Sequence, residues 1–122
     1  MNYLRARESQ DHVYLKRAIA TALRNIGFLF IVFEQCYCDV LALRPGTDGP
    51  FVLGVEIERS FRNVHTNIAR DFANGCSQVL VACKDTALRD RVAAHLPLDV
   101  RERVRIRTTH EIIAGDTTWM HN

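Results

Sequence analysis

Three acidic residues lie in two segments rich in strand-forming residues, and their side chains are suited to binding a divalent cation. Asp39 lies in the first segment, and Glu56 and Glu58 lie in the second. An ionised carboxylate in an apolar setting is costly unless a cation or a hydrogen-bond donor compensates it. Mg²⁺ prefers oxygen ligands, keeps several waters and needs only one or two protein carboxylates. The three acids therefore predict a site for Mg²⁺, in which Mn²⁺ is an alternative occupant.

A β-hairpin would bring these acids together. Residues 37–43 and 51–58 are strand-forming runs, and residues 44–50 between them are dense in turn formers. A symmetric loop pairs Arg44 with Phe51, which fixes the partners of every other residue in the hairpin.

That register pairs Asp39 with Glu56, and directly opposed residues have Cβ atoms about 5 Å apart. Side chains alternate along a strand, so Glu56 and Glu58 share one face, whereas Val55 and Ile57 share the other. A slip of one residue would move Asp39 to the far face. The expectation is that all three acids lie on one side of a buried sheet.

Hydrophobic periodicity predicts the elements that must position the hairpin. The continuous apolar run Val79–Ala82 is typical of a strand covered on both faces and parallel to a neighbour. In chain order, we expect a helix from Glu8 to Ile26 ended by Gly27, a strand over residues 28–34, the hairpin, a helix over residues 60–74 ended by Gly75, a strand over residues 78–83, a helix with Asp85 as its N-cap, a strand over residues 103–107, and a short helix with a Thr108/Glu111 capping box ended by Gly115.

Two helix faces carry polar residues that could serve the acids. The apolar stripe of the first helix continues back to His12 and Glu8, so both should face the sheet. The second helix should bury Phe61, Val64, Ile68 and Phe72, and its other edge is polar. The candidate polar residues at or near this second helix are Arg59, Arg62, Asn63, Asn67, Arg70 and Asn74.

Composition limits the class of protein. The chain has 122 residues, of which 48% are hydrophobic, and it has no linker-like segment, so residues 1–122 should form a single domain. It has no apolar run near the ~20 residues of a membrane span and no secretory signal, which predicts a cytoplasmic protein without a membrane partner. Arginine is favoured over lysine, with only Lys16 and Lys84 present. Arginine suits phosphate binding, although a genome rich in G and C produces the same bias.

The four cysteines do not indicate a metal site. Cys36 and Cys38 are spaced as same-face residues of a strand, and Cys76 and Cys83 flank another strand. No CxxC pair is present, so small buried core residues explain all four better than zinc or a disulfide does.

The order of elements, together with Asp39 and the Glu56-Ile57-Glu58 segment, resembles the PD-(D/E)xK restriction-endonuclease-like nucleases over about residues 8–106. The resemblance implies an α/β fold with an αβββαβ core, a mixed central sheet flanked by helices and an extra αβ unit at the C-terminus. The flanking pattern is similar to that of small resolvase-like and mobile-element members.

The resemblance also implies roles for individual residues. Asp39, Glu56 and the carbonyl of Ile57 would bind the cation, and Glu8 would supply the acid that many members carry on the first helix. Glu58 stands where the family has a lysine, so it would be a third ligand or the acceptor of a proton from water. His12 would hold a water or the scissile phosphate. The residues expected to contact nucleic acid, or to replace the missing lysine, are Arg59, Arg62, Asn63, Asn67, Arg70 and Lys16.

Each candidate also has a structural explanation. Glu56 and Glu58 could form a solvent face paired with Arg59 and Arg62, and Asn63 and Asn67 could belong to a solvated helix face. His12 is more often a core-edge histidine, and Glu8 suits a helix start. Asp39 is harder to explain in this way, because aspartate is disfavoured within an apolar strand.

Two functions follow as hypotheses. The first is a Mg²⁺-dependent endonuclease that hydrolyses phosphodiester bonds in DNA, as a homodimer or with a protein partner that supplies specificity. The alternative is a catalytically degenerate relative that binds nucleic acid or a protein without cleavage, since Glu58 replaces the family lysine. A small-molecule enzyme is disfavoured because the chain lacks a glycine-rich phosphate loop.

Overall fold

The computed structural model describes residues 9–33 and 38–120, so Glu8 and Cys36 lie outside the described residues. The helices and strands follow one another in the expected order, and the structure adds two 3₁₀ segments. The elements are α1 (Gln10–Asn25), β1 (Phe30–Phe33), β2 (Val40–Gly46), β3 (Gly49–Glu58), α2 (Val64–Ala73), β4 (Gln78–Cys83), α3 (Thr86–Ala94), η2 (Leu98–Arg103), β5 (Val104–Thr108), α4 (Thr109–Ile113) and η3 (Thr118–Met120).

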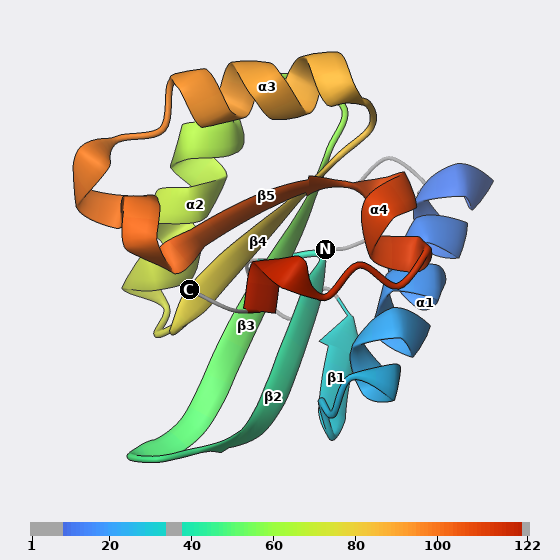
Figure 1. The fold of residues 1–122 in the computed structure, drawn as a ribbon, viewed down its shortest axis with the longest axis vertical. Coiled ribbons are helices and arrows are strands. Elements are labelled where there is room, and N and C mark those ends of the chain that lie inside the picture. Colours follow the sequence, from blue (N-terminus) through green and yellow to red (C-terminus); the bar gives the residue numbers. More distant parts are fainter. Residues whose placement is uncertain (1–8, 34–37, 121–122) are drawn as a thin grey trace, which may run out of the picture.

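The strands form one mixed sheet in the order β1-β2-β3-β4-β5 (Figure 1). Strand β2 is antiparallel to both of its neighbours, and β3, β4 and β5 run parallel to one another. Helices α2 and α3 are the crossovers between the parallel strands. The prediction of an α/β fold with a mixed central sheet is therefore confirmed, and so is the prediction that β4 runs parallel to a neighbouring strand.

Helices cover both faces of the sheet. Helices α1 and α4 lie on one face, over a core that includes Val40, Val55 and Leu80. Helices α2 and α3 lie on the other face, over a core that includes Val79 and Val81. Alternation along β3 and β4 thus divides the side chains between two hydrophobic cores.

The predicted hairpin register is confirmed, because Arg44 pairs with Phe51 and Val40 pairs with Val55. The predicted loop over residues 44–50 is wrong in extent. Pairing continues through Pro45 with Pro50 to Gly46 with Gly49, which leaves a two-residue turn. Gly49 has a φ of 115°, a conformation that glycine adopts without strain. Four of the predicted loop residues, Pro45, Gly46, Gly49 and Pro50, are therefore paired within the hairpin.

Other boundaries shift by a few residues. Helix α1 has Ser9 as its N-cap, with the Ser9 side chain accepting a hydrogen bond from the His12 N–H. Helix α2 begins at Val64, later than the expected residue 60, and Asn63 is its N-cap without a side-chain hydrogen bond. The Asp85 N-cap and the Thr108/Glu111 capping box are present as expected.

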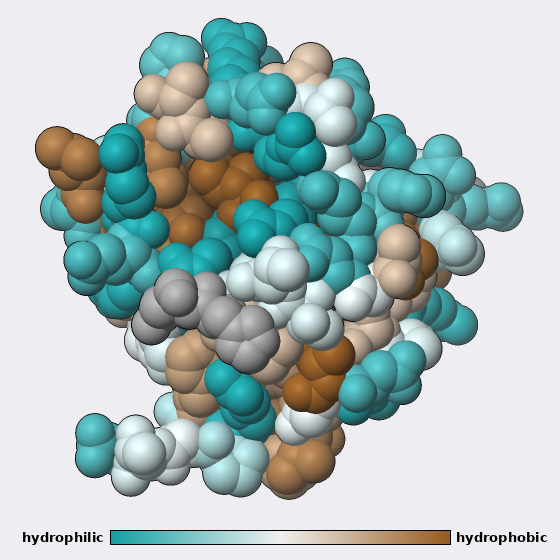
Figure 2. Space-filling view, in the orientation of Figure 1, coloured by the Kyte–Doolittle hydropathy of each residue, from teal (hydrophilic) through white to brown (hydrophobic). Residues whose placement is uncertain are grey.

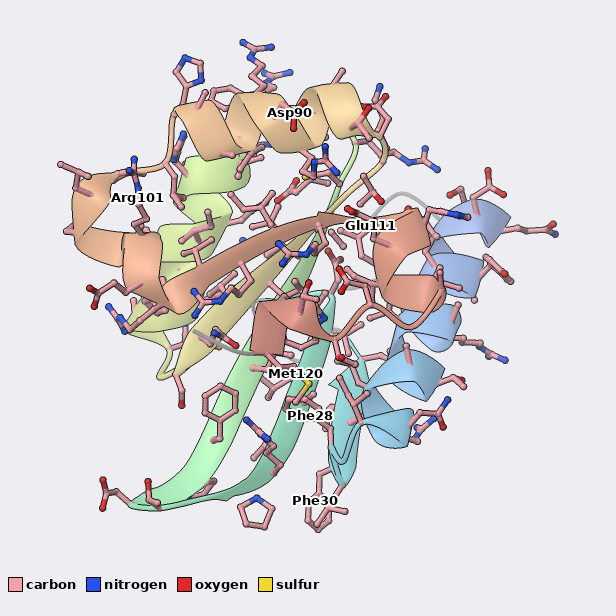
Figure 3. The ribbon with its side chains drawn as sticks, viewed as in Figure 1. Phe28, Phe30, Asp90, Arg101, Glu111 and Met120 are labelled. Carbon is pink, nitrogen blue, oxygen red and sulfur yellow. The ribbon has the colours of Figure 1, made fainter. Side chains whose placement is uncertain are left out.

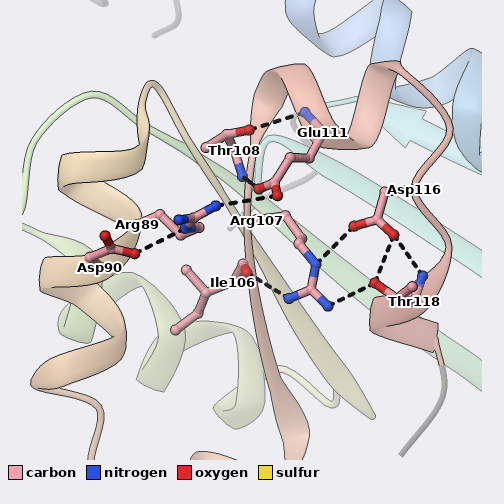
Figure 4. Close-up of polar contacts among 8 residues, drawn as sticks. All are labelled: Arg89, Asp90, Ile106, Arg107, Thr108, Glu111, Asp116 and Thr118. Atoms are coloured by element: carbon pink, nitrogen blue, oxygen red, sulfur yellow. Dashed lines mark hydrogen bonds and ion pairs between the residues drawn. The ribbon is translucent and has the colours of Figure 1, made fainter.

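The C-terminal segment is part of the fold. Trp119, for which the sequence carried no prediction, is 1% exposed and belongs to the core beneath α1 and α4. Its indole N–H donates to the Asp116 carbonyl at 3.0 Å. Figure 4 shows the polar contacts of the preceding residues, in which Arg107 binds Asp116 and Thr118. These contacts attach the last turn of the chain to β5.

The surface is mostly hydrophilic on the face shown in Figure 2, with apolar side chains gathered between α3 and β5. Among the described residues, Leu98 is the most exposed large hydrophobic residue, at 79%. Within residues 9–33 and 38–120, no helix has both the length and the apolar character that a bilayer crossing requires.

Candidate functional site

The candidate acids lie where β3 ends and β2 begins. Glu56 and Glu58 are only 3% and 8% exposed. In the parallel pair of β3 and β4 they align with Val81 and Cys83, whose side chains belong to the core under α2 and α3. The β3 acids are therefore buried beneath α2, and the interpretation of a solvated edge face is wrong.

Asp39 lies one residue before β2, so the confirmed register places its backbone beside Glu56. Its carboxylate accepts a hydrogen bond from the Ile57 N–H at 2.7 Å. Its other oxygen lies 3.2 Å from His12 Nε2 on α1. Asp39 thus joins the end of β3 to the first helix, and His12 faces the sheet as predicted. Glu56 and Glu58 contact residues of α2, and the nearby charge of Asp39 contributes to raising the pKa values of both.

Glu58 is held by the second helix. Asn67 Nδ2 donates to Glu58 Oε2 at 2.8 Å. Burial raises the pKa of Glu58, and the Asn67 hydrogen bond opposes this rise. The Asn67 amide is therefore engaged with the site, and its expected contact with a nucleic-acid backbone would require it to leave Glu58.

Glu56 is paired with a buried acid on α2. Asp71 is 0% exposed, and neither of its carboxylate oxygens nor Glu56 Oε2 has a hydrogen-bond partner when both groups are ionised. A proton on Glu56 removes this deficit, since the neutral carboxyl then donates to Asp71. Burial and the Asp71 contact raise the pKa of Glu56 to about 11, and burial raises that of Asp71 to about 6. Burial of two adjacent carboxyls therefore favours a form of the pair that retains one proton between them.

The close packing of this pair depends on a glycine. A Cβ at Gly54 would lie 3.2 Å from Asp71 Oδ2 and 2.8 Å from Cys76 Sγ. A side chain at this position of β3 would therefore push Asp71 away from Glu56. Because Gly54 has no side chain, the Asp71 carboxyl can pack directly against β3.

Sequence reasoning missed Asp71, although a signal was present. Val64, Ile68 and Asp71 are spaced by four and three residues, and Val64 and Ile68 are core residues of α2. The same helical periodicity places Asp71 on the buried face. The available signal was a charged residue, Asp71, on the apolar stripe of the predicted helix. It indicated a buried acid close to Glu56 and Glu58.

The candidate cations occupy different positions around the acids. Arg70 Nη2 lies 3.8 Å from Glu56 Oε2 with its side chain 45% exposed, which is a weak pairing. Arg59, Arg62 and Asn63 are exposed in the segment between β3 and α2. Lys16 is only 5% exposed on α1, which leaves it little surface to offer to a nucleic acid.

Comparison with protein-family models, with curated proteins and with solved structures gives no match for this chain.

The donor atoms of the site are all oxygens. Among the described residues, no group of three or more His, Cys, Asp or Glu side chains converges as a set of metal ligands. Loss of the proton between Glu56 and Asp71 would leave two carboxylates, which is the number that Mg²⁺ requires when waters complete its shell. Cys38, Cys76 and Cys83 are buried, as expected of core residues, and burial raises the pKa values of Cys38 and Cys83. Neutral buried thiols do not favour a zinc site.

Proposed function

We propose that this protein is a Mg²⁺-dependent nuclease that hydrolyses phosphodiester bonds in DNA. The observation that carries the proposal is the burial of Glu56 and Glu58 at the carboxyl end of β3, with the Asp39 carboxylate at the start of the adjoining strand. Buried carboxylates without a strong cation partner are costly, and a divalent cation would compensate them. The order αβββαβ and the mixed sheet support the resemblance to the restriction-endonuclease-like fold.

Mg²⁺ would be held by Asp39, Glu56, Glu58 and the carbonyl of Ile57, and Mn²⁺ could replace it. Bound there, the cation would lower the pKa of a water and offset negative charge on phosphate. The protein's own residues would orient these ligands. The Ile57 N–H and His12 fix the Asp39 carboxylate, and Asn67 fixes that of Glu58.

Proton transfer can be assigned to groups of this chain. The raised pKa of Glu58 makes its carboxylate a better acceptor for a proton from water than an exposed glutamate. His12 could relay a proton or hold a water beside Asp39. Arg59 and Arg62 are exposed cations near the site, and they would bind phosphates of the backbone without reading sequence.

The test is cleavage of supercoiled plasmid DNA with Mg²⁺ or Mn²⁺. Asp39→Asn keeps an acceptor for the Ile57 N–H but removes the charge. We expect it to lower the cleavage rate by about a hundredfold or more, because several kcal/mol of electrostatic stabilisation are lost. Asp90→Asn on α3 is the matched control, since Asp90 is 71% exposed and lies away from β3. Undiminished cleavage by Asp39→Asn would contradict the proposal.

The second candidate is a nuclease-like protein that binds nucleic acid or a protein partner without cleaving. It is favoured by Glu58, which occupies the place of the family lysine and is bound by Asn67. It predicts binding that weakens steeply with salt and no DNA cleavage with Mg²⁺ or Mn²⁺.

A further inference from the structure

An open pocket lies at the carboxyl ends of β3 and β4, next to the buried acids. Its volume is about 240 Å³, and its walls come from the start of α1, the end of β3, the residue after β4 and the start of α4. Glu58 forms part of its lining. Figure 1 shows these element ends meeting beside α4. A ligand in this pocket would therefore contact the edge of the candidate site.

Two cationic residues, Arg59 and Lys84, line this pocket. Cys83 aligns with Glu58, and the Lys84 N–H donates to the Glu58 carbonyl at 3.1 Å, which brings Lys84 next to Arg59. Both side chains are exposed, and within the described part of the chain no carboxylate is ion-paired with either. Neighbouring like charges favour an anion between them. Lys84 had no role in the sequence-based prediction.

The pocket is also lined by an aromatic ring from α1. Tyr14 on α1 is 64% exposed and lines the same pocket. Asp11, one turn earlier on α1, is also part of the lining and limits the positive charge on that side. An exposed aromatic ring in the same pocket as two cations suits a ligand that has a flat face and a phosphate. Sites for unpaired nucleic-acid strands combine these two features.

We propose that this pocket receives one unpaired nucleotide of a DNA strand, with its phosphate between Arg59 and Lys84 and its base against Tyr14. The inference rests on the proposed function, because the bound strand would lead past Glu58 to the buried acids. An unpaired strand is favoured over a duplex, since a base within a duplex is already stacked on its neighbours and must leave the stack to meet an aromatic side chain. The preferred substrate would then be single-stranded DNA or a junction with an unpaired end.

The experiment is a binding titration by fluorescence anisotropy in EDTA, so that binding is measured without cleavage. The probes are a labelled oligothymidine strand and the same strand annealed to its complement. We expect the wild type to bind the single strand more tightly than the duplex. Tyr14→Ala should weaken single-strand binding by roughly tenfold, and Tyr14→Phe should retain it, because the ring provides the stacking surface.

Lys84→Gln should also weaken binding and should make the slope of log K against log salt shallower by about 0.7, the loss of one phosphate contact on a single strand. Two exposed residues away from the pocket serve as matched controls. Phe30→Ala removes an aromatic ring at the start of β1, which Figure 3 shows at the opposite end of the molecule from Asp90, and Phe30 does not line the pocket. Arg24→Gln removes a cation in the last turn of α1. Both controls should bind like the wild type, and equal melting temperatures would confirm that every variant folds.

Wild-type single-strand binding by Tyr14→Ala and Lys84→Gln would overturn the inference, as would tighter binding of the duplex. The outcome is separable from that of the nuclease proposal. Cleavage that depends on Asp39, together with unchanged binding by Tyr14→Ala, would refute the pocket alone. Binding that depends on Tyr14 and Lys84, without cleavage by the wild type in Mg²⁺ or Mn²⁺, would refute the nuclease and support the pocket.

Discussion

The acids of β3 and the acids near the C-terminus lie in very different environments: the first are buried, and the second are paired with arginines. Glu111 and Asp116 each lie within 3.2 Å of an arginine, at Arg89 and Arg107, and each also accepts hydrogen bonds at a chain turn (Figure 4). Hydrogen bonds from Thr108 and Thr118 lower the pKa values of these two carboxyls. In this region, the charged side chains hold neighbouring segments of the chain together.

The β3 acids have the opposite environment. Burial raises the pKa values of Glu56, Glu58 and Asp71, and the nearest guanidinium stays 3.8 Å from Glu56. The same chain that supplies arginines to its C-terminal acids leaves these acids without a close cation. This contrast favours a ligand-binding role for the β3 region, because a purely structural role is better filled by apolar residues of similar volume.

The first prediction concerns the C-terminal region, which should contribute stability. Trp119→Ala removes a side chain that is 1% exposed, so it should lower the free energy of unfolding by about 3–5 kcal/mol. Urea denaturation measures this change. Mn²⁺ affinity of the folded variant at low temperature should match the wild type, since Trp119 is not among the candidate metal-binding residues. Loss of Mn²⁺ binding by a folded Trp119→Ala protein would contradict the assignment of stability to the C-terminal region and of cation binding to the β3 region.

The second prediction concerns pH and the acid pair. The folded protein keeps a proton on Glu56 that the unfolded chain releases above pH 4.5, so without metal the free energy of unfolding should fall as pH rises from 5 to 8. The limiting slope is about 1.4 kcal/mol per pH unit for one proton. Glu56→Gln should flatten this fall, because the amide donates to Asp71 at every pH. Urea denaturation across this range measures the difference between the two proteins.

Glu111→Gln is the matched control for the pH experiment. Glu111 has a lowered pKa, so its contribution to stability is present above about pH 4.5 and is lost as pH falls below that value. The slope of this variant between pH 5 and 8 should equal that of the wild type. Parallel curves for Glu56→Gln and the wild type would show that Glu56 and Asp71 do not share a proton.

Local sequence signals predicted most of the fold. The register followed from counting across a symmetric loop, and the caps at Asp85 and Thr108 followed from side-chain chemistry near the chain. The hairpin loop was overestimated because Pro45 and Pro50 are paired with each other directly beside the turn. Turn residues mark where a chain reverses, but they do not fix how many residues remain unpaired.

The candidate site was harder to predict because it depends on long-range packing. Glu56 and Glu58 were identified, but their burial and the contact of Glu56 with Asp71 depend on how α2 packs against the sheet. Lys84 was passed over because only the parallel pairing of β3 with β4 brings it beside Arg59. Trp119 was passed over because nothing in its neighbours along the chain indicates that the segment folds back onto α1 and α4.

The smallest expected effect tests whether the C-terminal polar network is purely structural. Thr108 is the N-cap of α4 and accepts a hydrogen bond from the Glu111 N–H at 3.0 Å. Thr108→Ala should lower the free energy of unfolding by about 1 kcal/mol, the usual cost of removing an N-cap. Thr108→Ser keeps the hydroxyl and should recover most of that loss. Because the β3 acids do not depend on this cap, the pH slope of both variants should match the wild type, and a changed slope would show that the two regions are coupled.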